Sequence, residues 1–536
     1  MQKLIYILLI LGGALCSALS TTAQKAAWAD IGFAKQYEAW LSSSNASGLK
    51  YSPIDTISTV ELYTTFRKGD FINYNQSNNS YNLGGQAESY FRLNPKVVFY
   101  GNICYNNFNG KNMGGSAFIQ PEIAPFNIVE YADSTRGEKK MERYKLAGAT
   151  AVSLNNKLSL GGRIDYTAAN YSKVKDLRHT NKLMDLSLSI GAMYKIGNIA
   201  DLGLNYIFRK RVEELTFKVY GKTDEIYNSL ISWGAFWGAT ETFSDNGFTR
   251  SGDNKPLTDK YNGASLQIDL NLSSRLDFFN EFSYMRRQGY FGIDSYSSII
   301  YTEHSSNIIQ YNGSLSLKQK RILQVLNLKL NYEKLENLKN NYSTIYVPEQ
   351  SISYTEYYEP SKVLNKTNTN LTIEYQAHID YNNFNPKWSF ELGADFRNRE
   401  LTASIYPYYR KQSINQTIGR LSAERNFIKG INMYNIRLGG QFSSGSGTVK
   451  DDGTYLSPTE GQSPPRSTDF NLYREYEYLT INSIKANVGL GYSRLLTEHK
   501  IRGYARIDYQ FTKAQDIKHI DGDTFNELSL VVGCSF

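Results

Sequence analysis

The sequence predicts an all-β chain, a transmembrane antiparallel up-and-down β-barrel of roughly 16–18 strands, with about 14 as the fallback. Three observations lead to this fold class. Apolar and polar residues alternate along many segments, short turns alternate with long polar connections, and the chain stops on a strand with an aromatic last residue. Long connections at one end only are typical of a barrel with short periplasmic turns and long extracellular loops.

The last strand shows the alternation most clearly. Its outward row is expected to be Leu528, Leu530, Val532, Cys534 and Phe536, since successive side chains of a strand point to opposite faces. A strand at the end of a chain leaves an unpaired edge unless another strand covers it. The sequence therefore predicts that this strand closes the sheet by pairing with the first one.

Further segments alternate in the same way, among them 157–168, 368–381, 387–398 and 500–511. Their apolar rows are expected to face lipid and their polar rows a hydrated lumen. The polar rows supply the candidate lumen residues, which are Arg163, Asp165, Glu374, His378, Asp380, Arg397, Arg437, Arg502, Arg506 and Asp508. Such charges either set solute selectivity or brace the interior as cross-strand pairs, and for an individual residue bracing is the expected role.

The connections between these segments fall into two classes. Short turns occur at positions such as Asn94–Pro95 and Gly197–Asn198. Long polar stretches are expected as loops at 107–142, 212–260, 288–308, 334–367 and 444–479. Consistent strand direction requires one more strand around 412–422.

The amino terminus has the basic start, short apolar run and small-residue end of a secretory signal peptide. Residues 1–23 are therefore expected to be removed by cleavage after Ala23. Residues 24–56 do not alternate and favour a short helix. We expect a periplasmic segment packed under the barrel, with a small plug in the lumen as the alternative, and the barrel itself over 57–536.

Composition excludes several classes of protein. The formal net charge of +8 over 536 residues is too mild and too dispersed to predict nucleic-acid binding. Beyond the signal peptide only Cys104 and Cys534 remain, so neither a disulfide framework nor a metal site is predicted. We expect no cofactor.

Candidates for chemistry are few. No phosphate-binding loop, zinc motif or nucleophile elbow is present, and we expect no enzyme. His378 lies on a predicted lumen row near acidic residues, so a hydrolase is the least favoured alternative. Loop aromatics at Trp233, Phe236 and Trp237 either bind an extracellular ligand or glycan, or pack loops and membrane girdle, and packing is favoured.

The signal peptide ending Thr-Ala-Gln, the alternating strands, the long aromatic loops and terminal Phe536 together resemble uncharacterised outer-membrane β-barrel families of the Bacteroidota type. The resemblance covers the chain from about residue 57 onward, through its pattern and without a residue-specific motif. It implies an outer-membrane location in a Gram-negative bacterium, with lipid and lipopolysaccharide around the barrel. It also implies that the barrel-assembly machinery reads the last strand through Leu528, Leu530, Val532 and Phe536.

The function expected from these features is a porin-like or solute-transport channel of unknown substrate. A wide barrel with a polar lumen can leave an aqueous path. The alternative is a surface-exposed binding or structural barrel whose loops fill the lumen.

Overall fold

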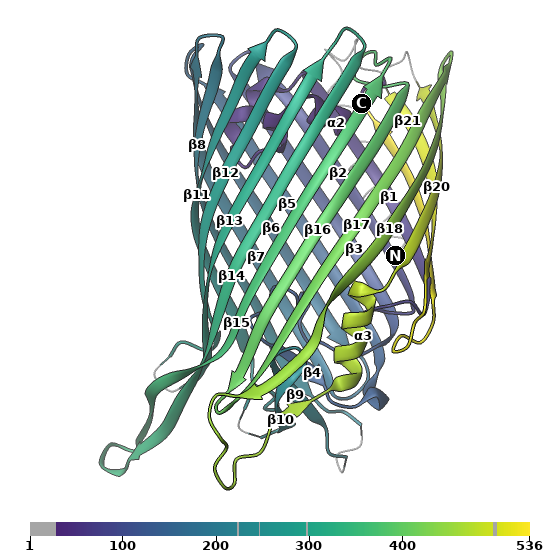
Figure 1. The fold of residues 1–536 in the computed structure, drawn as a ribbon. Helices are drawn as coiled ribbons and strands as arrows, with labels where there is room; N and C mark the ends of the chain where they lie inside the picture. Colours follow the sequence, from purple (N-terminus) through teal and green to yellow (C-terminus); the bar gives the residue numbers. More distant parts are fainter. Residues whose placement is uncertain (1–27, 222–224, 246, 296–297, 497–500) are drawn as a thin grey trace.

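The computed structural model describes residues 28–221, 225–245, 247–295, 298–496 and 501–536, and the predicted signal peptide with its cleavage after Ala23 lies outside them. Eighteen strands form one closed antiparallel barrel, because β1 pairs with both β2 and β22 (Figure 1). These strands are β1 (Thr56–Gly69), β2 (Asn79–Asn94), β3 (Val97–Met113), β5 (Gly137–Ser153), β6 (Leu158–Lys173), β7 (Arg178–Ile196), β8 (Ala200–Lys218), β11 (Lys255–Ser273), β12 (Leu276–Gly292), β13 (Ile300–Lys318), β14 (Ile322–Val347), β15 (Ile352–Ile379), β16 (Trp388–Ile405), β17 (Tyr408–Lys429), β18 (Asn432–Thr454), β20 (Ser483–Leu496), β21 (Ile501–Ala514) and β22 (Thr524–Ser535).

The barrel confirms the predicted fold class, and its strand number lies at the upper end of the predicted range. Closure depends on the last residues of the chain. The backbone N–H of Phe536 donates to the carbonyl of Ser58 at 2.9 Å, and the N–H of Ser58 donates back at 2.8 Å. The additional strand expected around 412–422 is the centre of β17. Within the barrel each of the eighteen described strands pairs with two neighbours, which removes the hazard of an open sheet edge there.

The outer face of the barrel is apolar, as the alternation predicts. Large hydrophobic side chains are exposed on strand after strand, for example Leu62, Ile103, Ile164, Ile190, Leu204, Leu438 and Val532. The neighbours of these residues along each strand point inward and are mostly polar. A hydrophobic exterior around a polar interior is the arrangement of a barrel that spans a bilayer.

Several strands extend far beyond the alternating segments, so the predicted extents of some loops are wrong. The stretch 334–367 was expected to be a loop, yet it is the end of β14 and the start of β15, joined by a 3-10 helix η4 (Pro348–Gln350). Outside the bilayer both faces of a strand meet water, so the apolar row that marks a membrane strand is lost there. Figure 1 shows this hairpin extending away from the barrel.

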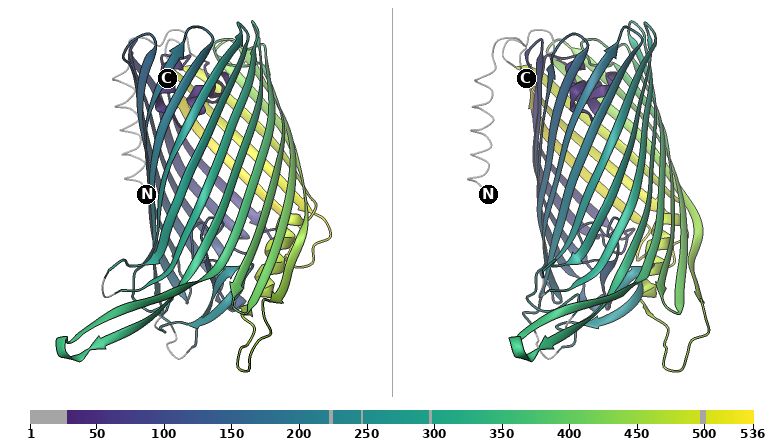
Figure 2. Two further views of the ribbon diagram at one scale, coloured as in Figure 1. Left: turned by 60° about the vertical axis from the view of Figure 1, so that its left-hand side comes forward. Right: turned by 90° about the vertical axis from the view of Figure 1, so that its left-hand side faces the viewer.

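Other elements lie at the two ends of the barrel. A short helix α2 (Ile31–Tyr37) and the 3-10 helices η1 (Ala39–Ser42) and η2 (Ala46–Tyr51) lie at the end with the short turns, inside the outline of the barrel in both views of Figure 2. At the other end are η3 (Asp133–Thr135), helix α3 (Asp469–Thr480) and a second sheet in the order β19-β10-β9-β4. Its strands are β4 (Asn127–Glu130), β9 (Asn228–Gly234), β10 (Trp237–Thr242) and β19 (Arg466–Ser467).

None of the described helices is long and apolar enough to cross a membrane.

Candidate functional site: a polar conduit along one wall of the barrel

The amino-terminal segment, residues 28–51, occupies part of the lumen. Its helix α2 begins after Asp30, whose carboxylate caps it by accepting from the N–H of Phe33 at 2.9 Å. Farther along, the indole N–H of Trp40 donates to Asp269 of the wall at 2.9 Å. The side chain of Asn45 donates to Gln267 at 2.9 Å and to the carbonyl of Ala192 at 3.1 Å.

Three lumen-facing glycines make room for this segment. A Cβ at Gly161 on β6 would overlap the backbone nitrogen of Ser47, and one at Gly191 on β7 would overlap the side chain of Asn45. A Cβ at Gly203 on β8 would lie 2.9 Å from the ring of Trp40. The wall and the segment are therefore shaped to one another.

The second sheet lies inside the opposite end of the barrel and packs on several strands, β15 and β16 among them. Its hydrophobic core packs on the inner wall, where Phe291 and Leu257 are fully buried. The predicted loop aromatics lie in or beside this sheet. Trp233 and Trp237 belong to that core, and Phe236 packs edge-on against Tyr74. All three aromatics are at most 5% exposed, and Trp233 and Phe236 line a small cavity of about 130 Å³.

Buried cations attach the loop 114–136 to the wall. The ammonium of Lys139 donates to the carbonyls of Gly114 at 3.0 Å and Ser116 at 2.8 Å. From β12, Arg287 donates to the carbonyl of Ile123 at 2.9 Å. Charge-assisted bonds in a buried site are strong, so this loop is a fixed part of the lumen.

Two cavities remain beside these elements, lined mainly by β15 to β22 together with β1 and β2. The turn-end cavity, of about 660 Å³, extends from α2 and the β15–β16 turn into the barrel. The loop-end cavity, of about 630 Å³, extends toward the first loop and α3. Both are lined by Gln441, Lys485 and Gln510, so they meet at these side chains. We call the two cavities together the conduit.

Ion pairs brace the wall of the turn-end cavity. Arg420 on β17 lies 2.8 Å from Glu374 and 3.2 Å from Glu391. A third carboxylate, that of Asp395, also pairs with it. One cation thus holds three carboxylates on two neighbouring strands. Cross-strand pairs of this kind contribute about 0.2–1 kcal/mol each.

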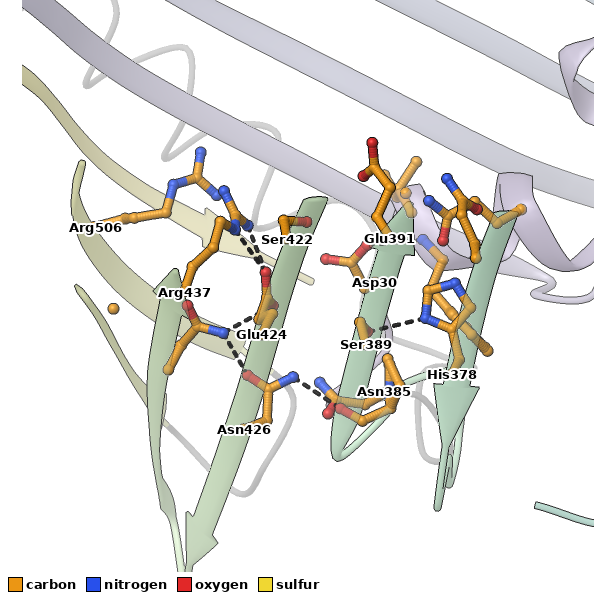
Figure 3. A pocket seen from close by; sticks show the side chains of 18 of the residues that line it. Asp30, His378, Asn385, Ser389, Glu391, Ser422, Glu424, Asn426, Arg437 and Arg506 are labelled. Atoms are coloured by element: carbon orange, nitrogen blue, oxygen red, sulfur yellow. Dashed lines mark hydrogen bonds and ion pairs between the residues drawn. The ribbon is translucent and has the colours of Figure 1, made fainter. Parts of the chain in front are cut away.

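A second group of charges lies on β17, β18 and β21. Arg437 is 2.6 Å from Glu424 and 3.8 Å from Asp508, which also lies 3.1 Å from Arg506. Figure 3 shows Arg437 and Arg506 beside Glu424 in this cavity. The side-chain amide of Asn435 donates to Glu424 and to Asn426, both at 2.7 Å, and so joins this group of charges to the polar side chains of the turn end. The wall is polar, hydrated and largely charge-balanced.

His378 and Ser389 form a hydrogen-bonded pair in the same cavity (Figure 3). Nδ1 of the ring lies 2.9 Å from Oγ of Ser389, its cross-strand partner. Phe33 packs edge-on against the ring, with centroids 5.0 Å apart. No carboxylate bonds the other ring nitrogen within the described ranges. A nucleophile and a base therefore meet there without an orienting acid.

Most of the candidate lumen residues lie where alternation places them. Those that line the conduit are His378, Arg397, Arg437, Arg502 and Arg506. Glu374 and Asp508 are ion-pair partners of this wall. Sequence reasoning missed Arg420, Glu424, Glu61 and Glu88. Arg420 and Glu424 lie two residues before and after Ser422, so the alternation of this strand places all three on one face and could have identified them.

The remaining candidates lie away from the conduit. Arg163 and Asp165 pair with each other on β6 at 2.6 Å and line neither cavity. Asp380 lies beyond the end of β15, with a left-handed φ of 57° that breaks the alternation. Its carboxylate pairs with Arg321 at 3.0 Å and Lys387 at 3.5 Å, so the structure places it in a turn and not on the lumen wall.

Within the described ranges, no group of three or more His, Cys, Asp or Glu side chains is arranged to hold a metal ion.

The ferric preacinetobactin receptor from Acinetobacter baumannii is 8% identical, with a TM-score of 0.40 over 90% of this chain and 80% of that one. The outer membrane transporter YddB from Escherichia coli is 8% identical, with a TM-score of 0.39 over 89% and 81%. The FrpB iron transporter from Neisseria meningitidis is 8% identical, with a TM-score of 0.36 over 92% and 83%.

No curated protein matches the sequence. A family model matches residues 46–536, which is the whole barrel together with η2. The chain belongs to this family, the family of unknown function DUF6850.

Proposed function

We propose that this protein is an outer-membrane channel that passes small polar solutes along the conduit. One observation carries the proposal. The two cavities meet at Gln441, Lys485 and Gln510, and together they extend from the turn end to the loop end of the barrel. A polar path inside an apolar exterior serves solutes that cannot cross lipid.

The proposal includes a location and partners. The barrel would lie in the outer membrane of a Gram-negative bacterium, with lipid and lipopolysaccharide against its apolar face. The barrel-assembly machinery would read the last strand through Leu528, Leu530, Val532 and Phe536. Support comes from the exposure of Leu530 and Val532 on the outer face and from the role of Phe536 in closing the sheet. The Bacteroidota lineage stays a prediction.

Single-channel recording in a planar bilayer tests the function. The protein is purified from membranes in its folded state, and a heat-dependent shift in gel mobility verifies that it is folded. We expect steady conductance, and we expect Gln441→Trp to reduce it because the ring narrows the junction of the two cavities. Leu438→Trp is the matched control, since Leu438 lies on the same strand but faces outward. Folded, inserted protein that gives no conductance would refute the channel.

A surface-binding barrel is the second candidate, and one observation favours it. Strand β14 loses its pairing to β13 after Lys339, and β15 pairs with β16 only from Leu364. Beyond these pairings β14 and β15 continue as a two-stranded ribbon, whose base contacts β13 and on which Tyr346 and Tyr358 are exposed. Exposed rings on a projecting ribbon are suited to stacking on an extracellular glycan. A channel-silent protein that loses glycan binding in Tyr346→Ala and Tyr358→Ala would establish this role.

A further inference from the structure

The charges of the loop-end cavity are not balanced in the way that those of the turn-end cavity are. Five charged side chains line it: Arg67, Asp395, Arg397, Lys485 and Glu527. Both carboxylates already have a cation, since Glu527 lies 2.5 Å from Arg67 and Asp395 pairs with Arg420.

Two cations of this cavity have no such partner. Within the described part of the chain, neither Arg397 nor Lys485 has a carboxylate within the 4.0 Å of an ion pair. Arg397 has only a weak contact, 3.5 Å from the side-chain oxygen of Gln416. Lys485 lies at the junction of the two cavities, beside Gln441 on the next strand. The cavity thus offers two positive charges that lie outside any ion pair of the described residues. The carboxylate of Glu527, itself paired with Arg67, acts on Lys485 only from beyond ion-pair distance.

Neutral groups around these cations can complete an anion site. Gln441 and Gln510 line the cavity together with Lys485, and a primary amide carries two N–H donors. Ser443 and Thr512 add hydroxyl groups on the neighbouring strands. Ammonium and guanidinium groups surrounded by amide and hydroxyl donors match the lone pairs of a carboxylate.

The conduit also has two carboxylates without an ion-pair partner among the described residues, and both lie in the turn-end cavity. The carboxylate of Asp30 caps α2 at the turn end, and Glu61 accepts from the hydroxyl of Tyr504 at 2.9 Å. Both line the turn-end cavity and neither lines the loop-end one. A solute that enters from the loop end therefore meets the two free cations before any free carboxylate.

We propose that the loop-end cavity is a binding site for small organic anions, with Arg397 and Lys485 as the groups that contact the anion. The inference deepens the proposed channel and rests on it for the direction of solute movement. It assigns the solute class as small molecules that carry a carboxylate. Anion selectivity of the conduit follows from the same two side chains.

Reversal potentials in a KCl gradient test the selectivity. We expect the wild type to favour chloride over potassium. One unit charge about 4 Å from an ion in a water-like medium changes its partition about fivefold. The double variant Arg397→Gln/Lys485→Gln should therefore lower the chloride-to-potassium permeability ratio at least fivefold at about 0.1 M salt, where screening is weak at this distance.

The matched control is Lys145→Gln. Lys145 lies on β5 between Tyr144 and Leu146, which are both exposed on the outer face, so its own side chain points into the lumen. It lines neither cavity, and its removal should change the ratio less than twofold. Equal changes in the control and the double variant, or no change in either, would overturn the inference while conductance continued to support the channel.

A second readout separates the site from the channel. Isothermal titration of the detergent-solubilised protein with succinate should show binding that the double variant loses and that Lys145→Gln keeps. Folded protein without conductance but with this binding would refute the channel and retain the anion site. Absence of succinate binding in the wild type would overturn the site itself.

Discussion

The substitution Gly161→Ala should displace the amino-terminal segment from the barrel wall. The added Cβ would overlap the backbone nitrogen of Ser47, which no change of side-chain rotamer can relieve. The backbone at Gly161 does not adopt a left-handed φ, so alanine itself fits the strand. The free-energy cost of the substitution therefore arises only at the contact with the segment. The substitution tests whether that contact holds the segment against the wall.

Its magnitude follows from the overlap. Inserting a methyl group into a packed contact costs about 1–3 kcal/mol. Because about 1.4 kcal/mol corresponds to a tenfold change in an equilibrium, the undocked population of the segment should rise about 5- to 150-fold. Undocking would also release the side chain of Asn45 from Gln267.

Hydrogen exchange followed by mass spectrometry measures this population. The amide of Gly48 is bonded to the carbonyl of Asn45 at 3.1 Å, so peptides over residues 40–51 report the opening. Exchange there should accelerate by the same factor. The control is Gly162→Ala, where the nearest atom to a Cβ is 4.0 Å away and the same residue change is made. Equal exchange in the two variants would refute the argument for a docked plug.

Two further predictions concern the stability of the barrel and the pH dependence of the docking of the amino-terminal segment. Ile103→Arg places a charge on the lipid face and should destabilise the folded barrel by about 2–4 kcal/mol in a urea titration in vesicles, whereas the lumen-facing change Asn102→Arg should cost clearly less. Burial raises the pKa of Glu38 from its ordinary value of 4.5 to about 7, while Lys318 opposes this shift. The docked segment therefore holds a proton that the undocked one releases, so docking is most stable below about pH 4.5 and loses at most about 3 kcal/mol as the pH rises to about 7. After division by the intrinsic exchange rate at each pH, the opening of residues 40–51 should rise across this range in the wild type and rise clearly less in Glu38→Gln, in which Asp269 beside Trp40 still titrates. An equal rise in the two proteins would contradict the assignment.

Much of the barrel could be predicted because its signal is local. A strand in a bilayer repeats every two residues, so residues such as Leu530 and Val532 reveal the lipid face without knowledge of their neighbours. The same rule placed Arg397 and Arg437 on the inner face. It failed in residues 334–367, because strands beyond the bilayer meet water on both faces and have no apolar row.

The candidate site could be predicted only in part. Alternation supplies the inward direction of a side chain, but it carries no information on which inward charges meet. Arg420 gathers three carboxylates from two other strands, whereas Lys485 keeps no ion-pair partner within the described ranges. Whether a lumen charge braces the wall or faces solute therefore depends on register and on the strands beside it.

The sequence by itself determined that the chain forms a closed barrel with an apolar exterior and a polar interior, since that pattern repeats within each strand. Only the tertiary structure decided how the interior is divided. The plug contact joins Asn45 to Gln267, and the loop anchor joins Ile123 to Arg287, residues far apart in the chain. Such contacts arise when the sheet closes and leave no periodic trace in the sequence. These elements fill part of the lumen and leave the conduit beside them.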